Sequence, residues 1–282
     1  MLIHLWRSLL LCFLKDQRGG SEMSLLKILC IGDVVGNGGC RYLSGGRLRR
    51  AARELGADFI IVNGENSASG NGMSRDSANS LLDSGADIIT GGNHTFKRRE
   101  VYDMLDDERA LLRPANYPSS VHGEGYTIAD CNGYRILVIN LLGCVFMESL
   151  ASPFETAEKI LKAEKGRYDI SVIDIHAEAT SEKMCLARYL DGKASVVFGT
   201  HTHVQTSDAT VLPGGTGYIT DLGMTGSMNG ILGVKTENII HKFTIKTPIF
   251  FEAAEGNESA HGAVFTVDTE TGKCTEAKAI TF

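Results

Sequence analysis

Short apolar runs recur along the chain, and many of them end at a glycine, a histidine or an acidic residue. Their apolar residues are consecutive and often β-branched, which is typical of strands buried on both faces. Helical spacing of apolar residues separates several of these runs. The predicted strands cover residues 26–31, 57–62, 86–90, 134–140, 168–175, 194–198 and 217–221, and the predicted helices cover 46–55, 75–84, 153–164 and 181–190. This alternation predicts an α/β fold with mixed or parallel sheets, in which chemistry gathers at the carboxyl ends of strands.

The two ends of the chain depart from this alternation. Residues 239–282 alternate apolar and polar positions, which predicts an antiparallel meander of half-solvated strands. Residues 1–22 contain an apolar stretch that is too short to span a bilayer comfortably and that lacks a good cleavage site. A second methionine, Met23, stands immediately before the first strand. We therefore expect residues 1–22 to be a disordered extension or a start-site artefact, and residues 24–282 to form one domain.

The net charge and the cysteine spacing argue against a nucleic-acid-binding protein, a membrane-binding protein and a disulfide-rich protein. The 282 residues carry a net charge of −6 with a pI of about 5.8, so no global basic field recruits nucleic acid or an anionic membrane. We therefore expect neither a stable nucleic acid partner nor a membrane partner, whereas a homo-oligomer stays compatible with the sequence. Seven cysteines occur without a Cys-x-x-Cys pair, which is typical of a reducing cytoplasm and not of a disulfide framework or a zinc knuckle.

Five of the strand-like runs end in side chains that can bind metal. The candidate ligands are Asp33, Glu65, Asn66, Asn93, His176, His201 and His203. Carboxylate, amide and imidazole groups without a thiolate suit manganese, iron or zinc. Seven ligands exceed the need of one four-coordinate zinc and suit two ions that share a bridging carboxylate and a bridging water. Each histidine alone could be an ordinary loop or core residue, but five coincidences at equivalent strand ends favour a metal centre.

His94, the neighbour of Asn93, suggests a site for substrate beside the candidate metal ligands. Gly91-Gly92 frees the backbone to turn, and the turn sets Asn93 and His94 side by side at the end of a strand. The amide oxygen of Asn93 suits a hard divalent ion, while His94 can face a substrate.

The motifs that contain these residues resemble a known family. They are Ile31-Gly32-Asp33-Val34-Val35-Gly36, Val62-Asn63-Gly64-Glu65-Asn66, Gly91-Gly92-Asn93-His94, Leu112-Arg113-Pro114-Ala115-Asn116-Tyr117-Pro118, His176-Ala177-Glu178-Ala179-Thr180-Ser181-Glu182-Lys183, Gly199-Thr200-His201-Thr202-His203-Val204-Gln205-Thr206 and Asp221-Leu222-Gly223-Met224-Thr225-Gly226. Their order is similar to that of calcineurin-like metallophosphoesterases, and more closely to the YmdB-type bacterial branch, a family of cyclic-nucleotide phosphodiesterases. The resemblance extends over about residues 24–282.

The resemblance implies a single metallophosphoesterase domain, a four-layer α/β/β/α sandwich of two mixed sheets, with two metal ions between the sheet ends. Iron is the first expectation for these ions, and manganese or zinc are the alternatives. Carried over by position, one ion takes Asp33, Glu65, Asn66 and His203, the other takes Glu65, Asn93, His176 and His201, and His94 is the general acid.

The chain departs from the broader superfamily at three positions. Val35 stands where a histidine ligand is usual, and the bridging carboxylate is Glu65 instead of an aspartate. Asn66 is expected to supply the missing ligand. Lys97 replaces an acidic residue that the family leads us to expect beyond His94, which changes the local charge.

The function implied is hydrolysis of 2′,3′- or 3′,5′-cyclic nucleotides. Two cations would neutralise the phosphodiester and activate a bridging hydroxide, and His94 would protonate the leaving oxygen. A phosphomonoesterase or a nuclease on the same site is the main alternative. A non-catalytic metal-binding regulatory protein would have no use for His94. A di-iron oxidoreductase would use paired Glu-x-x-His motifs on helices, which do not occur here.

Overall fold

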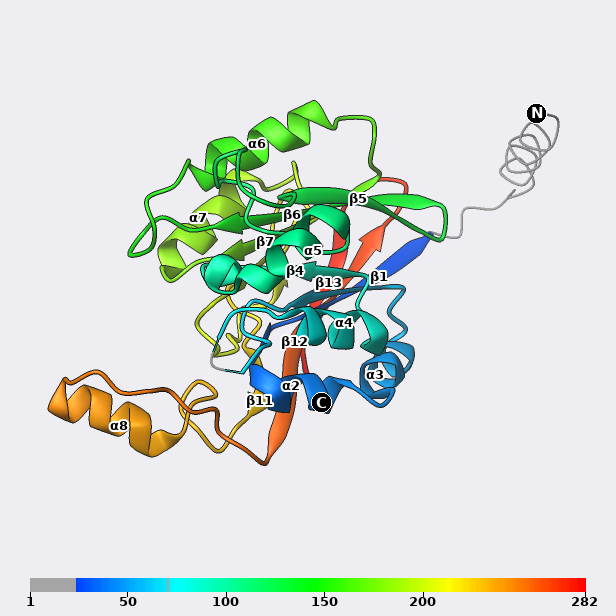
Figure 1. Ribbon diagram of the computed structural model, residues 1–282. Coiled ribbons are helices and arrows are strands. Elements are labelled where there is room, and N and C mark those ends of the chain that lie inside the picture. Colours follow the sequence, from blue (N-terminus) through cyan, green and yellow to red (C-terminus); the bar gives the residue numbers. More distant parts are fainter. Residues whose placement is uncertain (1–23, 70) are drawn as a thin grey trace.

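Two β-sheets face each other in the computed structural model, which describes residues 24–69 and 71–282 (Figure 1). The first sheet has the order β2-β11-β12-β1-β3-β4, with β13 paired to β12. Its strands are β1 (Leu25–Ile31), β2 (Asp33–Val34), β3 (Phe59–Asn63), β4 (Ile88–Thr90), β11 (Met224–Ser227), β12 (Glu258–Asp268) and β13 (Cys274–Thr281). Parallel pairs join β1, β3 and β4, whereas β12 runs antiparallel to β1. The sheet is therefore mixed.

The second sheet has the order β5-β6-β7-β8-β10-β9. Its strands are β5 (Tyr126–Cys131), β6 (Tyr134–Leu142), β7 (Ile170–His176), β8 (Val196–Thr200), β9 (Thr210–Val211) and β10 (Gly217–Ile219). The strands β6, β7, β8 and β10 are parallel neighbours, and antiparallel strands β5 and β9 close the two edges. This sheet is also mixed.

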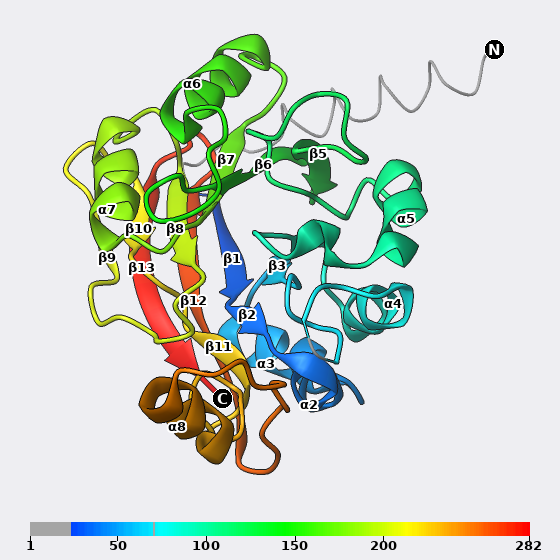
Figure 2. The ribbon, with the colours of Figure 1, turned by 60° about the vertical axis from the view of Figure 1, so that its left-hand side comes forward.

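Helices cover the outer face of each sheet (Figures 1 and 2). The first sheet is covered by α2 (Gly36–Leu43), α3 (Arg47–Leu55), α4 (Arg75–Ser84) and α5 (Tyr102–Asp107). Two short 3-10 helices, η1 (Thr95–Lys97) and η2 (Arg99–Val101), precede α5. The second sheet is covered by α6 (Pro153–Ala163) and α7 (Thr180–Tyr189). The layers therefore follow the predicted order α/β/β/α.

The side chains of β1 show why both faces of the first sheet are apolar. Successive residues of a strand point to opposite faces. Leu29 and Ile31 pack in the core under the helices, and Ile28 and Cys30 pack in the core between the two sheets. All four are fully buried. This arrangement explains the continuous apolar run in the sequence and leaves polar groups to the strand ends.

Most sequence-predicted elements are present, but the structure adds others that the sequence did not predict, among them α5 and β5, and two further differences have a clear physical reason. The sequence predicted no helix between the first strand and residue 46, but α2 begins at Gly36. The predicted meander over residues 239–282 is wrong in its first part, because α8 (Thr236–Ile245) occupies it before β12 and β13. Apolar residues three positions apart, such as Ile240 and Phe243, fit a helix better than alternation does.

Two further observations concern the chain as a whole. The expectation for residues 1–22 lies outside the described residues. Within the part of the chain that the structure describes, no helix is both long enough and apolar enough to cross a bilayer.

Candidate metal centre and active site

One half of the site forms around the ring of His176, the last residue of β7. The Nε2 atom of His176 lies 3.0 Å from Asn93 Oδ1, 3.0 Å from His201 Nδ1 and 3.4 Å from Glu65 Oε1. These groups come from loops that follow β3, β4 and β8. The carboxyl ends of strands from both sheets thus bring together four of the predicted ligands.

The other half lies beside Glu65 and uses the remaining three predicted ligands. Asn66 Nδ2 donates a hydrogen bond to Glu65 Oε1 at 2.7 Å. His203 Nε2 lies 3.3 Å from Asn66 Nδ2 and 3.7 Å from Asp33 Oδ1. All seven predicted ligands therefore gather in one cluster, with Glu65 between the two halves.

The three histidines of this cluster share one arrangement. Each ring uses one nitrogen for a partner outside the cluster and directs the other nitrogen inward. The outer contacts are His176 Nδ1 with Thr200 Oγ1 at 2.9 Å, His201 Nε2 with Glu178 Oε2 at 3.0 Å, and His203 Nδ1 with the Leu232 carbonyl at 3.1 Å. An outer partner that fixes the ring and its tautomer is the common second contact of a metal-binding histidine.

The donor set fits divalent cations. The Oδ1 atom of Asp33 is buried and has no hydrogen-bond partner among the described residues, although buried polar atoms are normally paired. Glu65, His176 and His201 each offer one ligand atom, and these atoms all lie within 4.8 Å of one another. Carboxylate and amide oxygens with imidazole nitrogens are ligands of manganese, iron and zinc.

The pKa values of these groups reflect the charges that are crowded together. Burial would lower the pKa of His176, but the carboxylate of Glu65 outweighs this effect and raises it to about 9. Burial raises the pKa of Asp33. The pKa of His201 falls to about 3, because the ring is buried and lies beside His176. Of these two histidines in contact, His176 therefore takes up a proton far more readily than His201.

The backbone at the site is shaped for close approach. A Cβ atom on Gly92 would collide with the Glu65 carboxylate and the His176 ring. His201 and His203 have φ angles of +103° and +64°, in the left-handed region that non-glycine residues rarely adopt. Strained residues of this kind persist where the surrounding structure holds them, and they concentrate at functional sites.

His94 lies at the edge of the cluster, as its position in the sequence predicts. Its Nδ1 atom is 2.9 Å from Asn66 Oδ1 and 3.1 Å from Glu65 Oε1, and its backbone N–H donates to Glu65 Oε2 at 2.9 Å. The Nε2 atom points away from these groups, 3.5 Å from Asn71 Nδ2. One ring nitrogen is thus held by the cluster, and the other faces the adjoining loop. Lys97 is exposed.

The sequence reasoning missed several polar residues behind the predicted ligands. Asp174, Asn63 and Thr200 are fully buried and hydrogen-bond to one another, and Glu178 contacts His201. Asp174 had a detectable signal, since it is the single carboxylate inside a fully buried strand. Glu178, Asn63 and Thr200 lie within the family motifs, next to or close to the candidate ligands.

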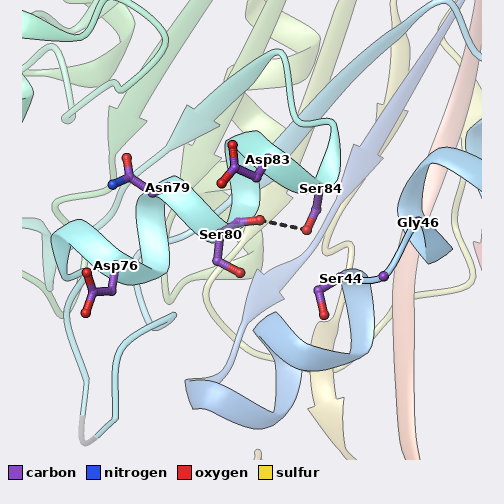
Figure 3. Close-up of a pocket in the computed structure, with 8 residues that line it drawn as sticks. Ser44, Gly46, Asp76, Asn79, Ser80, Asp83 and Ser84 are labelled. Carbon is purple, nitrogen blue, oxygen red and sulfur yellow. Dashed lines mark hydrogen bonds between the residues drawn. The ribbon is translucent and has the colours of Figure 1, made fainter.

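A separate pocket of about 350 Å³ lies between the α2–α3 turn and α4 (Figure 3). Its lining includes Asp76 and Asp83 from α4 and Gly46 from the turn, and Ser84 donates a hydrogen bond to the Ser80 carbonyl. None of its lining residues is one of the predicted ligands. This pocket is therefore distinct from the strand-end cluster.

Comparisons with known proteins identify the family of the chain and agree with its fold. Residues 29–280 match the family described as YmdB-like protein. A 2′,3′-cyclic-nucleotide 2′-phosphodiesterase of Bacillus subtilis (strain 168) is 45% identical over 255 residues, which cover 90% of this chain and 96% of the relative.

Two solved structures extend this similarity to the fold. A hypothetical protein from Thermus thermophilus has a TM-score of 0.85 at 39% identity, covering 91% of this chain and 99% of that one. A structure described as a novel phosphatase of Mycoplasma pneumoniae has a TM-score of 0.86 at 31% identity, covering 92% of this chain and 94% of that one. The predicted resemblance and the predicted sandwich are confirmed: the chain belongs to the YmdB-like family of metallophosphoesterases.

Proposed function

We propose that the chain is a dinuclear-metal phosphodiesterase whose substrates are cyclic nucleotides, with 2′,3′-cyclic nucleotides first among them. The observation that carries this proposal is the convergence of seven oxygen and nitrogen ligands around Glu65, with His94 beside them. The printed activity of the Bacillus subtilis relative supports the choice of substrate. The 3′,5′-cyclic nucleotides are the second class to be tested.

The ligands divide into two sets that share Glu65. Asp33, Asn66 and His203 form the first set, and Asn93, His176 and His201 form the second. Iron is the first candidate metal, followed by manganese and zinc, because the set contains imidazole and oxygen donors but no thiolate. Two such ions, when bound, would neutralise phosphate oxygens and lower the pKa of a water molecule toward neutrality.

His94 supplies the proton that the leaving ribose oxygen needs. Its Nδ1 atom lies within hydrogen-bond distance of Asn66 Oδ1 and Glu65 Oε1, and these two acceptors fix the orientation of the ring. The Nε2 atom points away from the proposed ligands and is the ring atom that would give its proton to the leaving oxygen. General acid catalysis of this kind contributes about 100- to 10,000-fold to a rate.

The test compares two leaving groups in the His94→Ala variant. This variant should keep its metals and lose at least about 100-fold with a cyclic nucleotide, because a ribose alkoxide needs protonation. It should lose much less with bis(p-nitrophenyl) phosphate, because p-nitrophenolate leaves almost unaided. His122→Ala is the matched control, since His122 is an exposed histidine paired with Asp106 away from the cluster.

Three outcomes would contradict parts of the proposal. Equal losses on both substrates with metals intact would assign His94 to orienting the phosphate. Loss of metal from the His94 variant would make it a ligand. Faster turnover of p-nitrophenyl phosphate than of any cyclic nucleotide by the unaltered protein would favour a phosphomonoesterase.

A further inference from the structure

A buried hydrogen-bonded chain lies directly behind His176. It runs from the His176 ring to the Thr200 hydroxyl and on to the carboxylate of Asp174. The Nδ1 atom of His176 is 2.9 Å from Thr200 Oγ1, and Thr200 Oγ1 donates to Asp174 Oδ1 at 2.8 Å. All three side chains are fully buried. Water therefore does not compete for these bonds.

The direction of each bond follows from the number of protons available. A carboxylate only accepts, so Thr200 must spend its single hydroxyl proton on Asp174. The oxygen of Thr200 can then only accept from His176, which places a proton on Nδ1. The remaining ring nitrogen, Nε2, faces Glu65, Asn93 and His201, where a bound metal ion would take its lone pair in place of a proton. The chain thus selects the tautomer that a metal ligand requires.

The orientation of Asp174 is itself fixed from the other sheet. Thr90 Oγ1 and Asn63 Nδ2 both donate to Asp174 Oδ2, the latter at 3.1 Å. Thr90 is the last residue of β4 and Asn63 the last of β3, whereas Asp174 lies in β7. One carboxylate oxygen is therefore anchored to the first sheet, and the other is left for Thr200.

We propose that Asp174 and Thr200 are positioning residues that hold His176 as the Nδ1–H tautomer, with Nε2 available to a divalent metal ion. Thr200 touches neither substrate nor metal in this assignment and acts through His176. The inference rests on the metal site proposed above and adds Asp174, which lies outside the ligand motifs, and a role for Thr200, which lies within one of them. Outer partners of this kind typically change metal affinity by about 10- to 100-fold when they are removed.

The first measurement needs no variant. The ring nitrogens of His176 can be assigned by 15N NMR of the zinc-loaded protein. The proposal requires a protonated Nδ1 and a zinc-bound Nε2. A proton on Nε2 with zinc on Nδ1 would overturn it, whereas failure of the unaltered protein to bind zinc would contradict the proposed metal site instead.

The second measurement is zinc affinity by competition with a chelator. Thr200→Val removes the hydroxyl at nearly constant shape and should weaken zinc binding by about 10- to 100-fold. Thr200→Ser restores a hydroxyl and should bind zinc nearly as the unaltered protein does. Thr216→Val is the matched control, because Thr216 is also fully buried and its hydroxyl donates to the Ala194 carbonyl at 2.6 Å, outside the ligand cluster.

The control should lose folding stability while keeping its zinc affinity. Equal zinc affinity in Thr200→Val and the unaltered protein would overturn the proposal. So would an equal loss of affinity in Thr216→Val, or a failure of serine to restore binding, because either result would assign Thr200 to general stability.

Discussion

The strand-end cluster and the segment around α8 are opposite extremes of the same molecule. Glu65, His176 and Asp33 are fully buried in the cluster. No residue of α8 is buried, and Figure 1 shows the helix held away from both sheets. We call residues 235–252 the α8 arm, since the Lys235 N–H donates to the Glu252 carbonyl at 2.9 Å and closes its base.

This difference in burial implies that the two regions differ in local stability. An isolated helix of ten residues is marginal in water, because few hydrogen bonds offset the cost of nucleation. The α8 arm buries little apolar area that could offset this cost of nucleation, since Ile240, Phe243 and Ile245 are all exposed. Local opening is therefore expected to cost little free energy in the arm and much more in the cluster.

The loop that precedes the α8 arm nevertheless contacts the cluster through a hydrogen bond. His203 of the cluster contacts the carbonyl of Leu232, in the loop from which the arm emerges. Changes within the arm beyond this loop are expected to leave the ligands in place. Changes to the ligands or to their outer partners are expected to alter metal binding.

The largest effect is expected from Glu65→Ala, because both proposed ligand sets share this carboxylate. Metal content should fall from about two ions per chain to near zero, and hydrolysis should fall by about 1000-fold or more, the scale of losing stabilisation of transition-state charge. Elemental analysis and a cyclic-nucleotide assay measure the two effects.

A buried glutamate elsewhere provides the control for Glu65. Glu164 is also buried, but it pairs with Arg167 and Tyr126 at the other end of the second sheet. Glu164→Ala should retain its metals. Full metal retention in Glu65→Ala would refute the shared bridge.

Removal of metal should lower the thermal stability of the whole domain. Metal at about 100 times its dissociation constant stabilises the native state by about 2.7 kcal/mol. For a protein of this size the midpoint of unfolding, Tm, should fall by about 5–10 °C on chelation. Calorimetry with and without chelator measures the change. An unchanged Tm would contradict preferential binding of metal to the native protein.

Glu178→Ala is expected to have a smaller effect on metal binding. Glu178 contacts the outer nitrogen of His201 at 3.0 Å, but its side chain is 54% exposed, so water can replace it. Metal affinity should fall by about 10-fold, the lower end for an outer partner. Glu158 is the matched control, because it is 51% exposed and pairs with Lys193. A loss as large as that of Glu65→Ala would make Glu178 a ligand.

The sequence predicted that the seven proposed ligands lie together, because they stand at or just beyond the ends of apolar runs. Strands buried on both faces leave few positions for polar groups, so the polar residue at the end of a run stands out. His176, His201 and Asn93 were found in this way. Asp174 and Thr200 were missed because their role depends on which side chains meet across the two sheets, and strand periodicity does not specify those contacts.

The α8 arm was predicted less well for the same physical reason. Periodicity reports the face of an element that is buried, and α8 has no buried face. The apolar residues of 239–251 were read as alternating strands, although only β12 and β13 beyond them form the predicted pairing. Helix α2 was missed because glycines dominate its first turn.

The smallest effect should come from Phe243→Ala in the α8 arm. Phe243 is 66% exposed, so its truncation removes little buried area, and exposed substitutions usually change the free energy of unfolding by no more than about 0.5 kcal/mol. Phe265→Ala in β12 is the internal reference, because Phe265 is fully buried between the sheets and its truncation should cost about 3–5 kcal/mol. Urea unfolding of both variants at two protein concentrations makes the comparison. A cost above about 2 kcal/mol for Phe243→Ala that grows with concentration would mean that another copy of the chain covers the arm in solution.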